Sequence, residues 1–91
     1  MEFEWDEVKD AANKAKHGVS LGDVVRLDWD NGQTRPDNRF AYGEARTEIL
    51  GVIAGRLYLY IFTMREGVYR IISLRKANIR EEGRYEQSRP K

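Results

Sequence analysis

The 91-residue chain has no cysteine and only one histidine. Without cysteine, it can form no disulfide, no thiolate metal site and no cysteine nucleophile. A single histidine also argues against a common zinc site and excludes an acid–base pair of two histidines within one chain. We therefore expect no metal and no cofactor, and His17, carboxylates or tyrosines must supply any acid–base chemistry.

The chain also lacks long apolar runs and a strong excess of one charge. No apolar segment has the length of a signal peptide core or a membrane-spanning helix, so we expect a cytoplasmic protein without membrane contact. The net charge is +1, from 16 basic and 15 acidic residues. This balance is not typical of nucleic-acid-binding proteins, so RNA or DNA binding would need a local basic patch.

The N-terminal part predicts mostly helix. Phe3 and Trp5 alternate with acids, which indicates a brief strand or an extended arm. Asp6 is a good N-cap for a helix over 6–17, whose inner face we expect to be Val8, Ala12 and Ala15. A second, shorter helix is predicted over 19–27, with Leu21, Val24 and Val25 facing inward. Residues 28–40 read as one long loop.

The remaining residues predict three antiparallel strands and a final helix. The strands are expected over 46–53, 56–65 and 68–75, with turns at 54–55 and 66–67. The middle strand is apolar on both faces, which favours a central, buried position. The last helix is predicted over 78–86, with Asn78 and Glu81 forming a capping box, and residues 88–91 as a frayed tail.

Together these elements predict one α+β domain over residues 1–91. Its expected order is a short strand or arm, two helices, a three-stranded antiparallel meander and a C-terminal helix.

Arginines interrupt the most apolar part of the chain, at Arg65, Arg70 and Arg75. Burying an unpaired charge is costly, so these side chains must leave the core or line a surface that needs positive charge. Regular alternation would place Arg75 on the face of Ser73, Ile71 and Tyr69. It would place Arg70 on the opposite face, where we favour a structural ion pair. Arg75 could instead pair with Glu81 or Glu82.

Ordered fragments over almost the whole chain resemble the BrnT toxin family. The fragments are Phe3-x-Trp5-Asp6-x-x-Lys9-x-x-x-Asn13-x-x-Lys16-His17-Gly18-Val19-Ser20, Tyr42-Gly43-Glu44-x-Arg46, Thr63-x-Arg65, Arg70-Ile71-Ile72-Ser73-x-Arg75-x-Ala77 and Glu81-x-x-x-Tyr85. The resemblance implies a RelE-like fold and a ribonuclease toxin that inhibits translation by cleaving RNA. It also implies a type II toxin–antitoxin system. The partner would be a BrnA-like ribbon-helix-helix antitoxin, through which the complex binds operator DNA.

Metal-free RNA cleavage needs a base for the 2′-hydroxyl, stabilisation of the phosphorane charge, a proton for the leaving oxygen and an in-line backbone. Arginine suits the charge, because its planar guanidinium binds phosphate through two hydrogen bonds. Our candidate catalytic residues are Arg75, Arg65, Glu81, Tyr85 and His17. Our candidate RNA-binding residues are Lys16, Lys9, Arg46 and Arg70.

Most of these candidates also have a structural explanation. His17 lies in the last helical turn, where the helix dipole should raise its pKa. Glu81 is accounted for by the capping box, and Tyr85, one turn further on, could simply pack. Arg65 could be an exposed turn residue. Arg46 could pair with Glu44.

Three hypotheses therefore compete. The leading one is an endoribonuclease toxin. The second is a catalytically inactive RelE-like module that binds an antitoxin and acts as co-repressor, and the third is an unrelated α+β domain with solubilising arginines.

Overall fold

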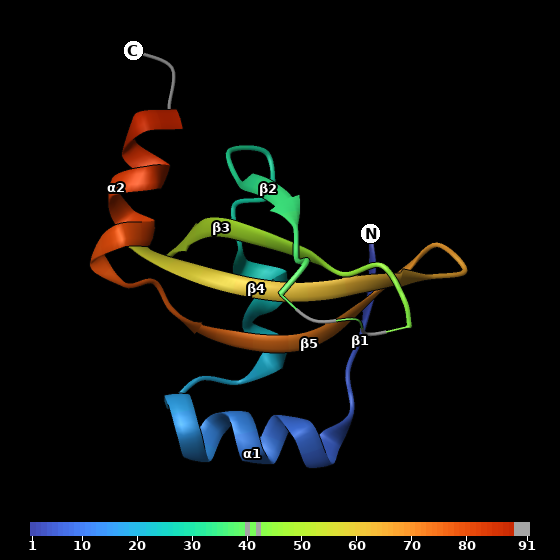
Figure 1. Ribbon diagram of the computed structural model, residues 1–91. Coiled ribbons are helices and arrows are strands. Elements are labelled where there is room, and N and C mark those ends of the chain that lie inside the picture. The colour runs from blue at the N-terminus through green and yellow to red at the C-terminus, as the bar shows by residue number, and fades with distance from the viewer. Residues whose placement is uncertain (40, 42, 89–91) are drawn as a thin grey trace.

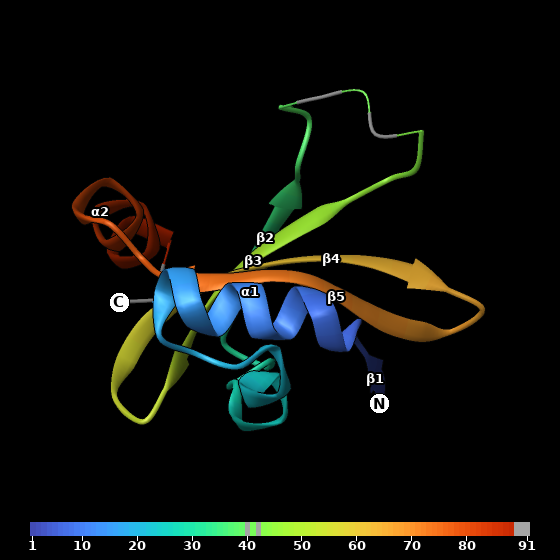
Figure 2. The same cartoon turned by 90° about the horizontal axis from the view of Figure 1, so that it is seen from below.

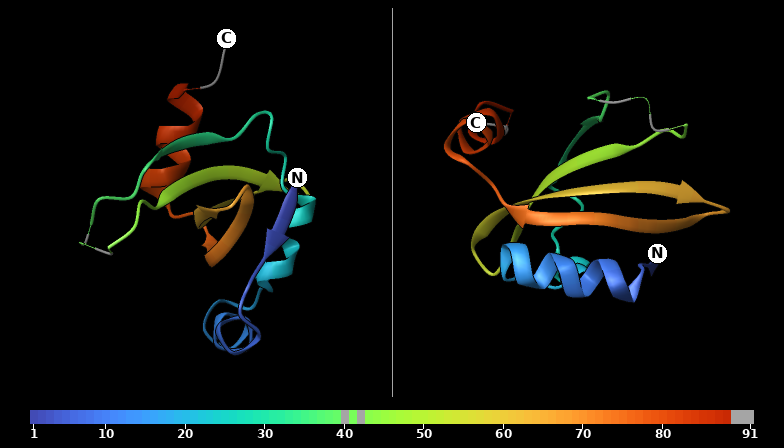
Figure 3. Two further views of the ribbon diagram at one scale, coloured as in Figure 1. Left: turned by 90° about the vertical axis from the view of Figure 1, so that its right-hand side faces the viewer. Right: turned by 60° about the horizontal axis from the view of Figure 1, so that its bottom comes forward.

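The computed structural model describes residues 1–39, 41 and 43–88, and these form a five-stranded mixed sheet with helical elements around it (Figure 1). The elements are β1 (Glu2–Glu4), α1 (Glu7–His17), the 3₁₀ helix η1 (Leu21–Arg26), β2 (Gln33–Pro36), β3 (Thr47–Ile53), β4 (Arg56–Arg65), β5 (Val68–Lys76) and α2 (Ile79–Ser88). The strand order is β1-β5-β4-β3-β2. Figure 3 shows η1 and α2 on opposite faces of the sheet, with α1 beside the edge of β5.

The predicted α+β class is confirmed, but the sheet has five strands and not only the three of the predicted meander. β3, β4 and β5 follow the predicted strands closely, and β4 is central. β2 lies inside the predicted loop 28–40 and pairs antiparallel with β3. The N-terminal segment is a strand, because β1 pairs in parallel with β5. Both added strands are very short, and their pairing with distant residues is not encoded in local periodicity.

Helix α1 begins and ends as predicted but presents a different face to the protein. Asp6 Oδ1 accepts hydrogen bonds from the Val8 and Lys9 amides at 2.8 and 3.1 Å, and Gly18 ends the helix with φ of 75°. However, Val8 is 79% exposed, and Ala12 and Ala15 are also exposed. The predicted apolar inner face is therefore wrong.

The buried face of α1 is polar, because it supplies hydrogen bonds to backbone that would otherwise be unpaired. Asp10 accepts from the Leu21 amide at 2.8 Å and from Ser20 Oγ at 3.0 Å, at the start of η1. Burial alone raises the pKa of Asp10, but these hydrogen bonds and nearby Lys14 hold the pKa below its ordinary value. Asp10 therefore stays ionised and joins α1 to η1.

Asn13 joins α1 to the open edge of β5, beside which α1 runs (Figure 2). β1 pairs only with residues 68–70 of β5. Beyond that point, Asn13 Nδ2 donates to the Leu74 carbonyl at 2.8 Å, and Asn13 Oδ1 accepts from the Leu74 amide at 3.2 Å. Nδ2 also donates to the Val19 carbonyl at 2.9 Å. The amide side chain thus replaces a neighbouring strand.

The second predicted helix is the 3₁₀ helix η1. Leu21 and Val24 are fully buried, as predicted, but Val25 is 65% exposed. A 3₁₀ helix has three residues per turn, so residues three apart lie on one face. Leu21, Val24 and Leu27 share that spacing and enter the core together, which leaves Val25 outside.

A bulge in β5 changes the predicted arrangement of its arginines. The register between β4 and β5 shifts at Ile61/Phe62, so that Ile61 lies opposite Ser73 while Phe62 lies opposite Ile71. The extra residue reverses the alternation. As a result, Arg70 and Arg75 share one face with Ser73, and the prediction of opposite faces was wrong.

Helix α2 confirms the predicted capping box and extends further than expected. The Glu81 amide donates to Asn78 Oδ1, and the Asn78 amide donates to Glu81 Oε1, both at 2.9 Å. The helix continues to Ser88, so this residue is not part of a frayed tail, and residues 89–91 lie outside the described part. No helix in the described part is long and apolar enough to cross a membrane.

Each face of the sheet carries its own core. One includes Leu21, Val24, Tyr60, Leu74 and a cluster of aromatic rings in which Trp29 packs against Phe3, Phe62 and Tyr69. The other core consists of Leu50, Leu59, Ile61 and Tyr85, so that α2 packs on the sheet through Tyr85.

The first core contains a polar atom that the fold leaves without a partner. Tyr60 is fully buried, and its hydroxyl has no hydrogen-bond partner among the described residues. Burial raises the pKa of this phenol far above its ordinary value. We expect Tyr60→Phe to raise the free energy of unfolding by about 1 kcal/mol, because it removes an unsatisfied buried group without changing the shape of the core.

Tyr85→Phe is the matched control for this prediction. The Tyr85 hydroxyl donates to the Asn31 carbonyl at 3.2 Å, so its removal should lower the free energy of unfolding by about 1 kcal/mol. Urea unfolding of both variants measures the two effects. A loss of stability in Tyr60→Phe would contradict the prediction.

Candidate functional site

The arginines gather on the face of the sheet that α2 partly covers. Cross-strand pairing places Arg75 beside Leu59 and Arg70 beside Thr63, and β4 alternation adds Arg65 to the same face. Nearby carboxylates bind these and neighbouring arginines. The pairs are Arg75–Glu81, Arg35–Glu48, Arg84–Glu48, Arg39–Asp37, Arg65–Glu44, Arg46–Glu44 and Arg70–Glu4.

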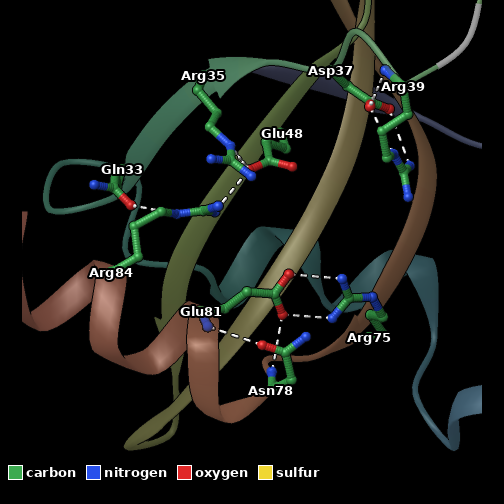
Figure 4. Close-up of polar contacts among 9 residues, drawn as sticks. All are labelled: Gln33, Arg35, Asp37, Arg39, Glu48, Arg75, Asn78, Glu81 and Arg84. Carbon is green, nitrogen blue, oxygen red and sulfur yellow. Dashed lines mark hydrogen bonds and ion pairs between the residues drawn. The ribbon is translucent and has the colours of Figure 1, made fainter.

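Arg75 and Glu81 form a bidentate ion pair (Figure 4). Arg75 Nη1 donates to Glu81 Oε1 at 2.6 Å, and Nη2 donates to Oε2 at 2.7 Å. Nη1 also donates to the Lys76 carbonyl at 3.3 Å. All partners of Arg75 in the described part therefore lie on its terminal nitrogens. The edge formed by Nε and Nη2 retains two donors, enough for a bidentate phosphate contact.

The environment keeps both members of this pair ionised. Burial raises the pKa of Glu81, but the hydrogen bonds from Arg75 and the Asn78 amide outweigh it, and the pKa lies below its ordinary value. The hydrogen bond to Glu81 raises the pKa of Arg75. A carboxylate with a lowered pKa is a weak base, so Glu81 is better suited to positioning Arg75 than to accepting a proton.

The three α1 candidates lie in a separate small hollow of about 230 Å³, formed by α1 and β5. Lys9, Lys16 and His17 line it together with Ser73. Burial, followed by the charges of Lys16 and Arg75, lowers the pKa of His17. The predicted rise in this pKa was wrong, because desolvation and two cations outweigh the helix dipole. His17 is therefore neutral at pH 7 and can accept a proton.

Other candidates lie apart from this pair. Arg65 and Arg46 bind the same carboxylate, Glu44, at 3.3 and 3.6 Å. The predicted ion pair of Arg70 is confirmed, with Glu4 at 3.4 Å.

Tyr85 is buried, and its hydroxyl points to the loop before β2. A larger hollow, of about 640 Å³, adjoins Tyr85 and is lined by Asp28 and Asp30, which suits an anion poorly.

Sequence reasoning missed a second arginine cluster. Glu48 is buried on β3 and binds Arg35 from β2 and Arg84 from α2. The sequence does contain one indication of this cluster. Glu48 is an isolated acid in an apolar strand, and a buried acid needs a cationic partner. Its partners were not predictable, because β2 was read as loop.

The described residues contain no group of three or more His, Cys, Asp or Glu side chains placed to hold a metal ion. Comparison with protein families matches residues 5–81 to the ribonuclease toxin BrnT of type II toxin–antitoxin systems. No curated protein matches the chain.

Proposed function

The chain belongs to the BrnT family of ribonuclease toxins of type II toxin–antitoxin systems, and we propose that it is a metal-independent endoribonuclease that cleaves RNA in the cytoplasm and thereby inhibits translation. Family membership implies an antitoxin partner. We propose that this partner is a BrnA-like ribbon-helix-helix protein that neutralises the toxin, and that operator DNA is bound only through their complex.

The observation that carries the proposal is the Arg75–Glu81 pair. Glu81 holds the guanidinium in place through two short hydrogen bonds and leaves its Nε edge for a ligand. A fixed guanidinium stabilises charge that develops on a phosphorane without reorganising during the reaction. In this scheme Arg75 binds the scissile phosphate, and Glu81 is a positioning residue.

His17 is the proposed base. It would take the proton of the 2′-hydroxyl while the 2′-oxygen attacks phosphorus and the bond to the 5′-oxygen breaks. The leaving 5′-oxygen takes a proton from water and departs as the 5′-hydroxyl. Its lowered pKa keeps the imidazole neutral at pH 7. Ser73, which lines the hollow of His17, lies two residues before Arg75 on the same face of β5, and this supports the assignment of both residues to one site.

A cleavage assay tests the proposal. A 5′-labelled single-stranded RNA is incubated with the purified chain in excess EDTA, and the product ends are analysed. We expect a 2′,3′-cyclic phosphate and a 5′-hydroxyl, and no cleavage of an RNA with 2′-deoxy sugars. An intact RNA, with folded protein confirmed by circular dichroism, would contradict the proposal and favour the inactive co-repressor.

The pH dependence of cleavage tests His17 separately. Because the neutral imidazole is the active form and its pKa is lowered, kcat/KM should be at its plateau at pH 7 and fall only at pH values below the ordinary pKa of 6.5. His17→Gln should lower the plateau about 100-fold and abolish the acidic limb. An unchanged acidic limb in His17→Gln would show that another group is the base.

A further inference from the structure

A second phosphate-binding subsite is suggested by the three residues of the Glu48 cluster, which we define as Arg35, Glu48 and Arg84. Glu48 Oε1 accepts a hydrogen bond from Arg35 Nε, and from Arg84 Nη2 at 2.7 Å. Arg84 Nε donates to Gln33 Oε1 at 3.2 Å, which fixes its orientation. Figure 4 shows both arginines reaching the carboxylate, one from β2 and the other from α2.

Stability alone gives little reason for this cluster. The Glu48 side chain is only 8% exposed, on the same face as Leu50 of the second core. Removing a charge from water is costly, and apolar side chains of similar volume often replace buried ion pairs without loss of stability. A buried carboxylate that binds two arginines therefore indicates a role in positioning them.

The cluster retains positive charge and unused donors. Two guanidinium groups and one carboxylate sum to +1. Arg35 is 55% exposed, and among the described residues it uses only Nε, so both of its terminal nitrogens remain for a ligand. Arg84 uses Nε and Nη2, which leaves Nη1. An oxyanion at this position would meet donors from two different elements.

The cluster also lies at a useful distance from Arg75. Arg75 is on β5 and Glu48 on β3, with β4 between them, and their side chains share one face. Two strand spacings correspond to about 10 Å, and the register sets Glu48 opposite Ser73, two residues from Arg75, so the two backbone positions are about 12 Å apart. A short stretch of nucleic-acid backbone spans this distance, so both positions can bind phosphates of one strand.

We propose that Arg35 and Arg84, held by Glu48, bind a backbone phosphate of the same RNA strand, a short stretch away from the phosphate bound by Arg75. The inference rests on the proposed function, because it takes the RNA substrate as the ligand. Contacts to phosphate fix the position of a nucleic acid without reading its sequence. The cluster therefore orients the strand for cleavage and contributes affinity.

Salt-dependent binding of a non-cleavable RNA tests this inference. The probe is a fully 2′-O-methylated single-stranded 10-mer, which lacks the attacking hydroxyl. We expect Arg35→Gln/Arg84→Gln to raise Kd about tenfold and to reduce the slope of log K against log salt by about 0.7 for each lost phosphate contact. Arg35→Gln alone tests the same point without disturbing α2. The matched control, Arg26→Gln, changes an exposed arginine of η1 on the opposite face and should leave Kd and slope unchanged.

The outcomes distinguish this inference from the proposed function. If the wild type cleaves and binds RNA but neither Arg35 variant changes the slope, the subsite is wrong and the ribonuclease remains. If the folded wild type neither binds the 10-mer nor cleaves RNA, both are wrong. Weaker binding with a reduced slope in the Arg35 variants, but not in Arg26→Gln, supports the subsite.

Discussion

Replacing Arg75 with alanine is expected to reduce kcat/KM for RNA cleavage by about 1,000-fold. Removal of one preorganised donor to a developing oxyanion typically lowers kcat by a factor of 100 to 1,000. Arg75 supplies two such donors, Nε and Nη2, on the edge of the guanidinium that Glu81 leaves open. The substitution also leaves Glu81, which is mostly buried, without its main cationic partner. That uncompensated carboxylate repels the phosphate, so the full effect should lie near the upper end of the range. Cleavage of labelled RNA under single-turnover conditions measures it.

Two further variants separate charge from geometry. Arg75→Lys keeps the positive charge but loses the planar fork, so we expect a loss of about 100-fold rather than recovery. Arg26→Ala removes an exposed arginine, 3.9 Å from Asp23 on the other side of the sheet, and should cleave at the wild-type rate. If folded Arg75→Ala retains wild-type activity, the proposed site is wrong, even though the chain belongs to the BrnT family.

The largest expected effect on stability is that of Asn13→Ala. The substitution leaves both backbone groups of Leu74 and the Val19 carbonyl without their side-chain partner. Each unsatisfied buried group costs about 1–3 kcal/mol, so we expect a loss of about 4 kcal/mol. For a domain of this size, the midpoint of thermal unfolding should fall by roughly 20 °C. Urea and thermal unfolding measure both quantities.

Asn31→Ala is the matched control, because its side chain makes an exposed hydrogen bond to Asp28 at 2.7 Å. Its loss should cost less than about 1 kcal/mol. Asn13→Asp keeps an acceptor for the Leu74 amide but places a carboxylate against two carbonyls, so it should be at least as unstable as Asn13→Ala. Wild-type stability in Asn13→Ala would contradict the prediction. It would show that water or a shift of α1 provides hydrogen bonds to the Leu74 amide and carbonyl at the edge of β5.

The sequence predicted elements well where local signals were strong. Asp6 and Gly18 set the ends of α1, and the Asn78–Glu81 capping box marked the start of α2. Face assignments were less successful. Helical periodicity assumes that the inner face is apolar, whereas α1 is anchored by the polar side chains of Asp10 and Asn13.

The site was predictable only where its residues are close together in the sequence. The Arg75–Glu81 pair joins the end of a strand to the start of the next helix, so a local pattern contains both residues. The bulge at Ile72 has no such signal, yet it decides that Arg70 and Arg75 share a face. The Glu48 cluster depends on β2, β3 and α2 meeting in space, which only the tertiary structure provides.

The edge of β5 also has a consequence for how the chain folds. β1 completes the sheet by pairing with residues 68–70, and Asn13 binds Leu74 across a separation of 61 residues. Contacts between residues so far apart form late, because closing a long loop costs entropy before any contact repays it. We therefore expect the β3–β4–β5 hairpins to form first and the N-terminal segment to dock last. During synthesis His17 leaves the ribosome early, but the site proposed for His17 and Arg75 can be assembled only once β5 has emerged, so we expect an incomplete nascent chain to be inactive.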